Sequence, residues 1–339
     1  MIGAKSYTIG FQIGHVATCD FSKLIPVKNA DILRLGRAGT VDERLVTFLG
    51  KKMGIENRYH CPKDLNSLDL ARDALKALIE AEPSIVEEAE FLILAGISNP
   101  MPTVCTSSLL AGEFGFKHTS CWDLKSGCST GILATMQALD WLNLGAKKGV
   151  IICTETLTKF ANPEALQMSA STGDGAVAFS IHASSDWEVL GAVHGTDAEY
   201  LKAMYVPGTF PVEENFNPMD YVFAFDGKAD TIEKMGYHWQ KSLQDLLETS
   251  GLKGEEVDHY IAHQVDGKKN LAFAKSAGIK EENVALHFKD FGNMGCPTVF
   301  KNYKNWTEEK GKEFKSGETL VLHAVGGGIS WAGICLRKK

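Results

Sequence analysis

Two stretches of the sequence share one pattern and decide the fold: "VEEAEFLILAG" at residues 86–96 and "GEEVDHYIAHQ" at residues 254–264. In each, the acid-rich end of an expected helix leads into a short apolar strand. The first strand starts at Phe91 and the second at His259, an offset of 168 residues. A pattern that recurs at a fixed offset is typical of a duplicated fold. The same offset should therefore recur elsewhere in the chain.

The offset recurs in two further pairs of expected strands. The stretch "KKGVIICTET" at residues 147–156 parallels "SGETLVLHAVG" at residues 316–326, with an offset of 169 residues between the strand starts. A looser pair is "DGAVAFSI" at residues 174–181 and "ISWAGICLRK" at residues 329–338. Helices that alternate with short apolar strands predict mainly parallel sheets covered by helices.

The sequence therefore predicts an α/β fold with two similar halves. We place the boundary in "HASSDWEVLG" at residues 182–191, which gives an N-terminal half of residues 1–185 and a C-terminal half of residues 186–339. Active sites of open α/β sheets form where strand ends and their loops converge. Functional residues are therefore expected on strand-end loops of both halves, at the junction.

Composition narrows the class of protein. The 339 residues suffice for two domain-sized cores, and 44% apolar with 23% charged residues is ordinary for a soluble globular protein. A net charge of −7 argues against a nucleic-acid or membrane-surface binder. The N-terminus "MIGAKSYTIGFQIG" lacks a signal-peptide pattern, and no apolar run approaches the ~20 residues of a membrane span.

The eight cysteines are scattered, and none belongs to a CxxC pair. This pattern indicates neither a zinc site nor a redox dithiol. It fits a reducing compartment best. We expect a cytoplasmic protein without a metal.

One cysteine stands apart: Cys128, in "CWDLKSGCSTG" at residues 121–131. The following residues, "GILATMQALDWLNLGA", place apolar side chains at helical spacing, so a helix should begin directly after the cysteine. Unpaired N–H groups and the helix dipole favour a thiolate at that position. The alternative is a buried, inert cysteine, and this stretch taken alone slightly favours that alternative.

Three features on expected strand-end loops of the second half are candidate partners of Cys128. His263 ends the strand in "IAHQ", Asn293 lies in the turn "FGNMGCP" after an expected strand at residues 284–288, and glycines 326–328 separate two strands. Each has a plain alternative: a structural histidine, an ordinary turn residue and a sharp bend. Four such features spread over both halves favour a common site.

These motifs resemble the β-ketoacyl-acyl-carrier-protein synthase III family of the thiolase superfamily, over nearly the whole chain. The segments that carry the resemblance are "GIENRYH", "DLKSGCSTG", "STGDGAVA", "AHQ", "GNMGCPT" and "AVGGGISWAG". The separation of 30 residues between His263 and Asn293 is also similar to that of the family. The resemblance implies a thiolase-like fold with layers in the order αβαβα. It also implies a homodimer that needs no cofactor.

The resemblance further implies the chemistry of a condensing acyltransferase. An acyl group is loaded on Cys128 as a thioester, and a malonyl or β-ketoacyl thioester then condenses with it. The backbone N–H groups of Cys128 and Gly327 are implied as an oxyanion hole. His263 and Asn293 are implied as neutral donors that stabilise the enolate formed by decarboxylation.

Three positions depart from the family in the region that contacts the adenine of coenzyme A. Phe48 stands where a tryptophan is usual, Lys52 where an arginine is usual, and Leu166 where a second arginine is usual. A phenylalanine still stacks, whereas a lysine lacks the planar fork of arginine. We therefore expect coenzyme A to be recognised less well than in the family.

Other positions bear on the substrate. Lys268 and Lys275 stand where the family has basic residues that meet the acidic acyl carrier protein, although a lysine pair is also a common solvated face. Thr103 stands where some members carry a phenylalanine that closes the acyl channel, so longer donors are expected. Lys125 replaces a small apolar residue of the cysteine loop, and nothing in the sequence explains it.

The sequence leaves the pathway open between fatty acid synthesis and a specialised, polyketide-like role, and the departures favour the second. Two other functions stay open as well. One is a catalytically silent partner subunit of a ketosynthase complex. The other is an acyltransferase or thioester hydrolase in which Asn293 orients His263.

Overall fold

The computed structural model describes residues 7–32, 43–162, 170–225, 228, 230–310 and 314–339. The α-helices are α1 (Asn29–Ile32), α2 (Glu43–Thr47), α3 (Ser67–Ala81), α4 (Ile85–Glu88), α5 (Thr106–Phe114), α6 (Thr130–Asn143), α8 (Thr231–Ser250), α9 (Gly267–Ser276), α10 (Phe288–Phe291) and α11 (Pro297–Lys310). The strands are β1 (Phe11–Thr18), β2 (Ile25–Lys28), β3 (Asn57–His60), β4 (Phe91–Ala95), β5 (Ser120–Leu124), β6 (Lys148–Glu155), β7 (Gly175–Ala183), β8 (Trp187–Thr196), β9 (His259–Ala262), β10 (Thr319–Gly326) and β11 (Ser330–Lys338).

The strands lie in the order β5-β4-β6-β7-β1-β8-β11-β10-β9. Strands β2 and β3 form a separate two-stranded sheet. The order repeats, because β4-β6-β7-β1 in the first half corresponds to β9-β10-β11-β8 in the second. In both halves the first pair is parallel and the second is antiparallel. The α/β fold with mixed sheets is therefore confirmed. The proposed boundary after residue 185 falls between β7 and β8.

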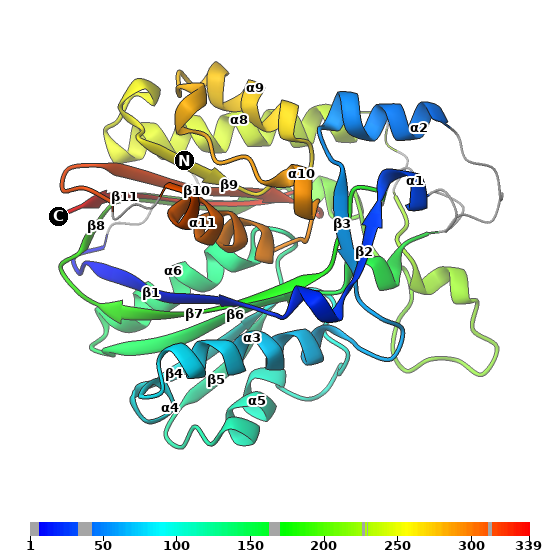
Figure 1. Cartoon of the computed structure of the whole chain (residues 1–339), viewed down its shortest axis with the longest axis horizontal. Helices are drawn as coiled ribbons and strands as arrows, with labels where there is room; N and C mark the ends of the chain where they lie inside the picture. The colour runs from blue at the N-terminus through cyan, green and yellow to red at the C-terminus, as the bar shows by residue number, and fades with distance from the viewer. Residues whose placement is uncertain (1–6, 33–42, 163–169, 226–227, 229, 311–313) are drawn as a thin grey trace.

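The two sets of strands meet at one point, where Phe11 of β1 pairs with Trp187 of β8. Figure 1 shows them as two sheets in separate layers, with α6 and α11 between them. Helices α3, α4 and α5 cover one outer face, and α8 and α9 cover the other. This arrangement is the predicted αβαβα order of layers.

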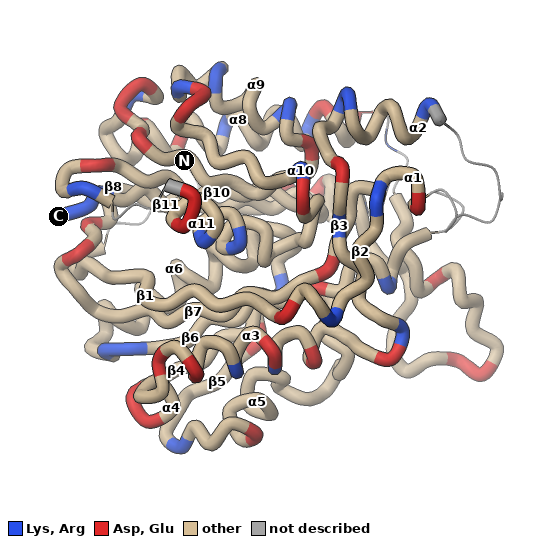
Figure 2. The backbone as a smooth tube through the Cα atoms, viewed as in Figure 1, with Lys and Arg blue, Asp and Glu red and all other residues tan. Residues whose placement is uncertain are grey.

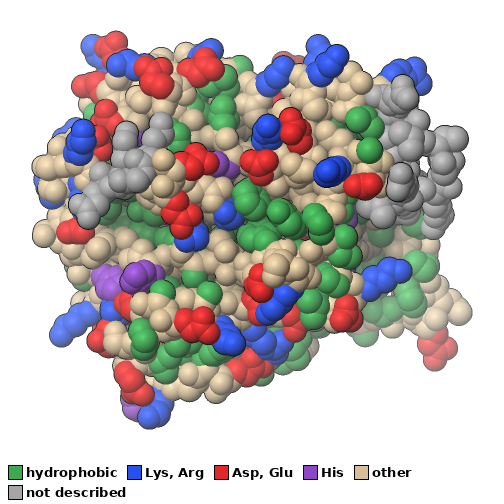
Figure 3. Space-filling model, viewed as in Figure 1, with side chains coloured by type: hydrophobic (Ala, Val, Ile, Leu, Met, Phe, Trp, Pro, Cys, Tyr) green, Lys and Arg blue, Asp and Glu red, His purple; other side chains and the backbone are tan. Residues whose placement is uncertain are grey.

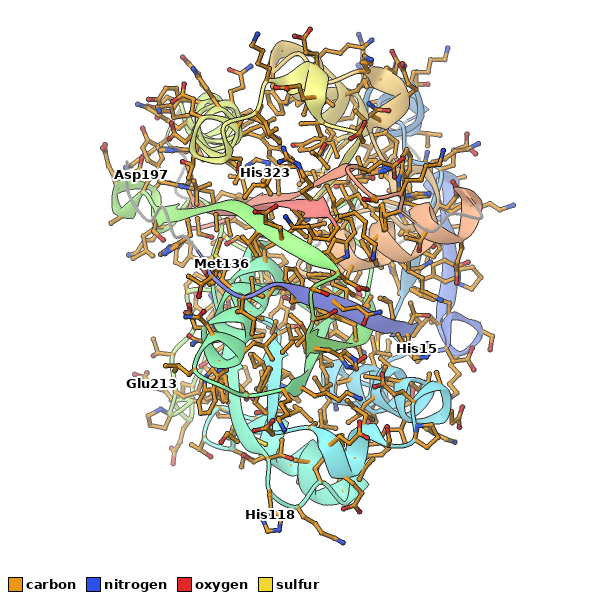
Figure 4. The ribbon with its side chains drawn as sticks, turned by 90° about the vertical axis from the view of Figure 1, so that its left-hand side faces the viewer. His15, His118, Met136, Asp197, Glu213 and His323 are labelled. Carbon is orange, nitrogen blue, oxygen red and sulfur yellow. The ribbon has the colours of Figure 1, made fainter. Side chains whose placement is uncertain are left out.

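Helix α6 forms much of the central layer, as its sequence pattern predicts. Ile132, Met136, Leu139 and Leu142 are all buried and belong to the largest apolar cluster of the described residues. Figure 4, turned by 90°, shows Met136 between the two sheets. Burying an apolar side chain of this size stabilises the fold by roughly 1.5–3 kcal/mol. The helix that follows Cys128 is therefore fixed firmly in the molecule.

The outer helices have one apolar face each. In α3, Leu68, Leu75 and Leu78 are buried, and Asn66 begins the helix with a capping box that includes Asp69. On the other outer face α8 packs on β10, where the Ser242 hydroxyl lies 2.8 Å from the ring nitrogen Nε2 of His323. Figure 4 labels this histidine in the upper half of the view.

The strand expected at residues 284–288 is absent. The described residues there form only an isolated bridge between Tyr260 and Val284, followed by the short helix α10. The side-chain amide of Gln264 donates to the Ala285 carbonyl and accepts the N–H of His287, so beyond the bridge the backbone of this segment is bound to a side chain and not to the edge of β9. Asn293 therefore follows a helix.

One surface of the molecule carries an aromatic cluster. The rings of Phe21, Tyr59 and Phe291 lie 5.0–5.8 Å apart, and the ammonium group of Lys301 lies 4.2 Å from the centre of the Phe291 ring. Figure 3 shows apolar side chains gathered on the face that α10, β2 and β3 occupy in Figure 1.

Among the described residues, no helix is both long and apolar enough to cross a lipid bilayer.

Candidate active site

Cys128 lies at the N-terminus of α6, as predicted, and only 6% of it is exposed. The loop before the helix is tied to itself by a hydrogen bond from the Thr130 hydroxyl to the Gly127 carbonyl, 2.6 Å long. It is tied to β11 because the Ser330 hydroxyl donates to the Ser126 carbonyl at 3.0 Å. The cysteine is thus held by contacts from both halves of the chain.

The glycine turn between β10 and β11 lies directly against Cys128. A Cβ atom on Gly326 would come within 2.4 Å of the Cys128 backbone nitrogen, and a Cβ on Gly127 would come within 2.7 Å of the Gly327 carbonyl oxygen. Only glycine allows backbones to approach this closely. The glycines of both segments therefore serve to bring the two loops together.

Burial raises the pKa of the Cys128 thiol to about 12, and the charge of Glu155 adds to this shift. Hydrogen bonds from the backbone N–H groups of Gly327 and of Cys128 itself act in the opposite direction and lower the pKa. Desolvation outweighs the N–H groups and the dipole, so the thiol form is favoured at this helix N-terminus, where a thiolate was expected. The two N–H groups nevertheless point at the reacting sulfur.

His263 follows β9 directly and is fully buried. Its backbone is fixed, because its N–H donates to the His323 carbonyl at 2.8 Å and its carbonyl accepts from the Asn270 amide at 2.6 Å. Neither nitrogen of its ring has a hydrogen-bond partner among the described residues. Burial lowers the pKa of His263 to about 3, and the Gly295 backbone, which approaches the ring outside hydrogen-bond geometry, opposes the shift. The ring is therefore neutral at physiological pH.

Asn293 lies in the turn between α10 and α11, next to the loop before β7. Its backbone N–H donates to the Ser171 carbonyl at 2.8 Å, and its carbonyl accepts from the N–H of Gly173 at 2.8 Å. Its side-chain oxygen accepts the N–H of Gly295, also at 2.8 Å. The amide oxygen is thus occupied within the turn, which leaves the NH₂ group as the end that can meet a ligand.

Close packing of α6 on the start of α11 brings the cysteine and the asparagine turn together. A Cβ atom on Gly131 of α6 would lie 3.0 Å from the sulfur of Cys153 and 3.1 Å from the carbonyl of Cys296. Cys296 directly follows Gly295, whose N–H binds the Asn293 side chain. The structure therefore gathers Cys128, His263, Asn293 and Gly327 at the junction of the halves.

A cavity of about 980 Å³ opens onto Cys128. Gly295 and Gly327 line it with the cysteine, whereas the side chains of His263 and Asn293 do not. Its apolar lining includes Leu65, Ile97, Leu157, Phe160, Leu201, Met204, Val206, Phe210 and Phe223. These residues could not be predicted from the sequence, because they come from separate loops that share no sequence pattern.

One acidic residue that the sequence analysis missed also lines the cavity. Glu155 is the last residue of β6, and only 1% of it is exposed. A signal for it exists in the sequence, since an acid two positions after the apolar run "GVIIC", still within the strand, is unusual in a buried strand.

The predicted substrate-binding residues lie at several places. Phe48 is 48% exposed and begins a π-helix (Phe48–Met53) that also carries the exposed Lys52. Leu166 lies outside the described residues. Thr103 is exposed and does not line the cavity described above, and the structure gives no role to the exposed Lys125 beyond a place on the cavity lining.

The predicted docking residues Lys268 and Lys275 are both exposed on α9, which packs against the π-helix. Lys275 forms an ion pair of 2.5 Å with Glu281. Figure 2 shows Lys and Arg residues along α9, at the start of α2 and in the π-helix that follows α2. Among the described residues no group of His, Cys, Asp and Glu could hold a metal ion.

A layered duplicated α/β fold with a cysteine, a neutral histidine and an asparagine at its junction defines a thiolase-like condensing acyltransferase. Family models match both parts of the site. Residues 122–198, which include Cys128, match the model of 3-oxoacyl-[acyl-carrier-protein] synthase III. Residues 247–338, which include His263 and Asn293, match the C-terminal model of the same enzyme. The chain belongs to the 3-oxoacyl-[acyl-carrier-protein] synthase III family.

Relatives span almost the full chain. A β-ketoacyl-[acyl-carrier-protein] synthase III of Streptococcus gordonii is 24% identical over 310 residues, which cover 90% of this chain and 93% of the relative. One from Halalkalibacterium halodurans is 26% identical over 303 residues, 89% of this chain and 91% of the relative.

Solved structures share the fold. A 3-oxoacyl-(acyl-carrier protein) synthase from Burkholderia xenovorans superposes with a TM-score of 0.85 at 21% identity, over 99% of this chain and 96% of the other. Cerulenin-bound OleA from Xanthomonas campestris gives a TM-score of 0.81 at 22% identity, over 98% of each chain.

Proposed function

We propose that this chain condenses an acyl group held on Cys128 with a malonyl or β-ketoacyl thioester and releases a β-ketoacyl thioester. The observation that carries the proposal is the arrangement at the junction. A thiol at the end of an apolar cavity meets two backbone N–H groups, and a neutral histidine with two unpartnered nitrogens lies near a free amide.

In the first half-reaction the Cys128 thiol gives up its proton and its sulfur attacks the thioester carbonyl of the donor, while the departing carrier sulfur takes up a proton. The carbonyl oxygen becomes an oxyanion, and the N–H groups of Cys128 and Gly327, which meet the sulfur before the reaction, are the donors next to it. The carrier thiol leaves, and the acyl group stays on the sulfur within the cavity.

In the second half-reaction a malonyl thioester loses carbon dioxide and becomes an enolate. His263 and the NH₂ group of Asn293 serve as donors to the enolate oxygen. Because the pKa of His263 is lowered to about 3 by burial, the ring donates as a neutral group and does not protonate the carbanion. The carbanion then attacks the acyl thioester, and Cys128 is released.

The geometry favours condensation over thioester hydrolysis. A hydrolase of the Cys-His-Asn type needs the asparagine to accept a hydrogen bond from the histidine ring. Here the Asn293 oxygen is bound to the N–H of Gly295, and the ring of His263 has no partner among the described residues. A silent partner subunit has no need of a cysteine held in this way.

Mass analysis of the intact protein after incubation with a panel of acyl thioesters tests the proposal. We expect one acyl group per chain, which a malonyl thioester then removes as a β-ketoacyl product. Release of free acid without such a product would support hydrolysis, and no acylation by any donor would contradict the proposal.

We propose that the donor is longer than acetyl. A cavity of about 980 Å³ lies at the upper end of the range for small-molecule sites, far beyond the needs of two carbons. We expect an eight-carbon thioester to acylate Cys128 at least about tenfold faster than an acetyl thioester, because burial of each methylene contributes about 0.8 kcal/mol. Single-turnover acylation rates measure this ratio, and faster acylation by acetyl would refute the idea.

We also propose that carrier-protein donors are preferred to coenzyme A donors. Loss of a planar cation that stacks on adenine should remove roughly 1–2 kcal/mol of binding, or about tenfold in affinity. The exposed Lys52 and Lys268 lie on adjoining helices and can attract an acidic carrier protein. This attraction weakens with salt.

The test is kcat/KM for one acyl group on both carriers at low and high ionic strength. The carrier-protein advantage should shrink as salt rises, and Lys268→Ala should reduce it. The variant Lys76→Ala, on α3 at the opposite outer face, serves as the control. Equal or better use of coenzyme A at low salt would show that the nucleotide has another site.

We propose a cytoplasmic location, in keeping with the scattered cysteines.

We also propose a homodimer that forms through β5. Among the described strands β5 ends the sheet and pairs with β4 alone, so its outer edge can pair with a second copy. Met101 and Val104, in the loop that carries Thr103, are 37% and 39% exposed nearby. Sedimentation should show a dimer at micromolar concentration, and a monomer throughout would contradict this.

A further inference from the structure

Glu155 has no role in the steps above, although it shares the cavity with Cys128. Its carboxyl group is buried at the end of β6, and within the described part of the chain no lysine or arginine pairs with it. An ionised carboxylate buried without a cation is costly. The groups that contact the Glu155 carboxyl group must therefore account for its burial.

The carboxyl group of Glu155 holds the loop that follows β4. One oxygen accepts the N–H of Ile97 at 2.9 Å, and the other accepts the N–H and the hydroxyl of Ser98 at 3.1 and 2.5 Å. The Ser98 hydroxyl also accepts the N–H of Thr156 at 2.9 Å. Because Ile97 and Ser98 line the cavity, Glu155 fixes one of its walls.

The same side chain supports the turn that carries Asn293. The thiol of Cys296 lies 3.6 Å from one carboxyl oxygen of Glu155. A Cβ atom on Gly295 would lie 3.0 Å from the Cγ atom of Glu155. The residue therefore touches both segments that face the cysteine.

We propose that Glu155 is a positioning residue for the acylation of Cys128: it fixes the cavity wall at residues 97–98, and its charge opposes the formation of the thiolate. The second part rests on the enzyme's use of Cys128 as nucleophile, and so on the function proposed above. A protonated Glu155 makes the thiol easier to ionise, and an ionised Glu155 makes it harder.

The electrostatics agree with this role. Burial raises the pKa of Glu155 to about 7, although hydrogen bonds from Ser98 and Ile97 oppose the shift. Glu155 in turn adds to the effect of burial in raising the pKa of Cys128.

The other titratable groups around the pair are two buried thiols, a neutral ring and exposed charged side chains of the cavity lining. Burial holds the pKa of the Cys296 thiol well above its usual range. Cys153 lies beside Gly131, and His263 stays neutral. The remaining charges on the cavity lining are Lys63, Asp64, Lys125 and Lys159, all of which are exposed. Glu155 is therefore the group near Cys128 that changes charge near neutral pH.

The charge of Glu155 sets how the thiolate fraction of Cys128 depends on pH. Below its pKa Glu155 is neutral, and the thiolate fraction of Cys128 rises tenfold for each pH unit. As Glu155 ionises, its charge raises the pKa of the thiol, so the thiolate fraction rises less steeply between about pH 6 and 8. Above that range the full slope returns.

Alkylation of Cys128 by iodoacetamide measures this curve without any acyl substrate. Peptide mapping separates Cys128 from the other cysteines. In the unaltered protein we expect the logarithm of the rate to bend between about pH 6 and 8, and in Glu155→Gln to rise in a straight line. At pH 8 the variant should react roughly tenfold faster. A merely structural residue would not change the slope.

Two controls separate charge from structure. Ser98→Ala removes a hydrogen bond that stabilises the carboxylate but keeps the charge, so the bend should remain and move to higher pH. Glu82→Gln removes a carboxylate that pairs with Lys148 at the far end of β6, so the curve should not change.

The proposal is overturned if the unaltered protein shows no bend, if Glu155→Gln keeps the same bend, or if Ser98→Ala abolishes it. Should Glu155→Gln fail to fold, the shift in Ser98→Ala still decides. Acylation assays run in parallel separate the two claims. The expected alkylation curves without acylation by any thioester would contradict the proposed function and leave the charge effect of Glu155 intact.

Discussion

Protein with Cys128→Ala is expected to form no acyl-enzyme with any thioester donor and to make no β-ketoacyl product. Cys128 is the thiol that two backbone N–H groups stabilise at the head of the cavity. Cys121 lies in the strand that precedes the Cys128 loop, and it is half-buried because β5 is an edge strand. Burial nevertheless raises the pKa of Cys121.

Peptide mapping after loading with an acyl donor measures where the acyl mass resides. Cys121→Ala is the matched control, and it should acylate like the unaltered protein. Acyl mass on another cysteine, or normal product formation by Cys128→Ala, would show that the nucleophile is misassigned.

The second large effect concerns the two enolate donors. We expect His263→Ala and Asn293→Ala each to slow condensation by ~10²–10³, the usual cost of removing one such donor, while acyl-enzyme still forms. The separation follows because acylation uses the N–H groups of Cys128 and Gly327, whereas the enolate forms where His263 and the Asn293 amide lie. Single-turnover acylation and condensation rates, measured separately, check it.

A histidine outside the site serves as the control for these variants. His182 is half-buried on β7 beside Glu82, and His182→Ala should leave both rates unchanged. Variants of His263 and Asn293 that lost acylation but still released carbon dioxide at the normal rate would reverse the assigned roles.

Much of this arrangement could be predicted from the sequence, because it rests on local patterns. The strands at Phe91 and His259 are apolar runs bounded by helix ends, and their common offset predicts the duplicated order of strands. The apolar spacing after Cys128 predicts α6 and places the cysteine at its N-terminus. These features depend on neighbours in the chain.

What could not be predicted depends on segments far apart in the sequence. The raised pKa of Cys128 reflects burial first and the charge of Glu155 second, and both follow from packing that brings the two together. The missing strand at residues 284–288 reflects the Gln264 side chain, which binds the backbone of Ala285 and His287. Local apolar character alone does not show whether a partner edge exists.

Release of carbon dioxide from a malonyl carrier protein tests the central claim most directly. After loading with an eight-carbon acyl group, the enzyme should release carbon dioxide and form β-ketoacyl product in equal amounts. Protein with Cys128→Ala should form no product. Loss of the acyl group from Cys128 without carbon dioxide release would mean that the protein is not a condensing enzyme.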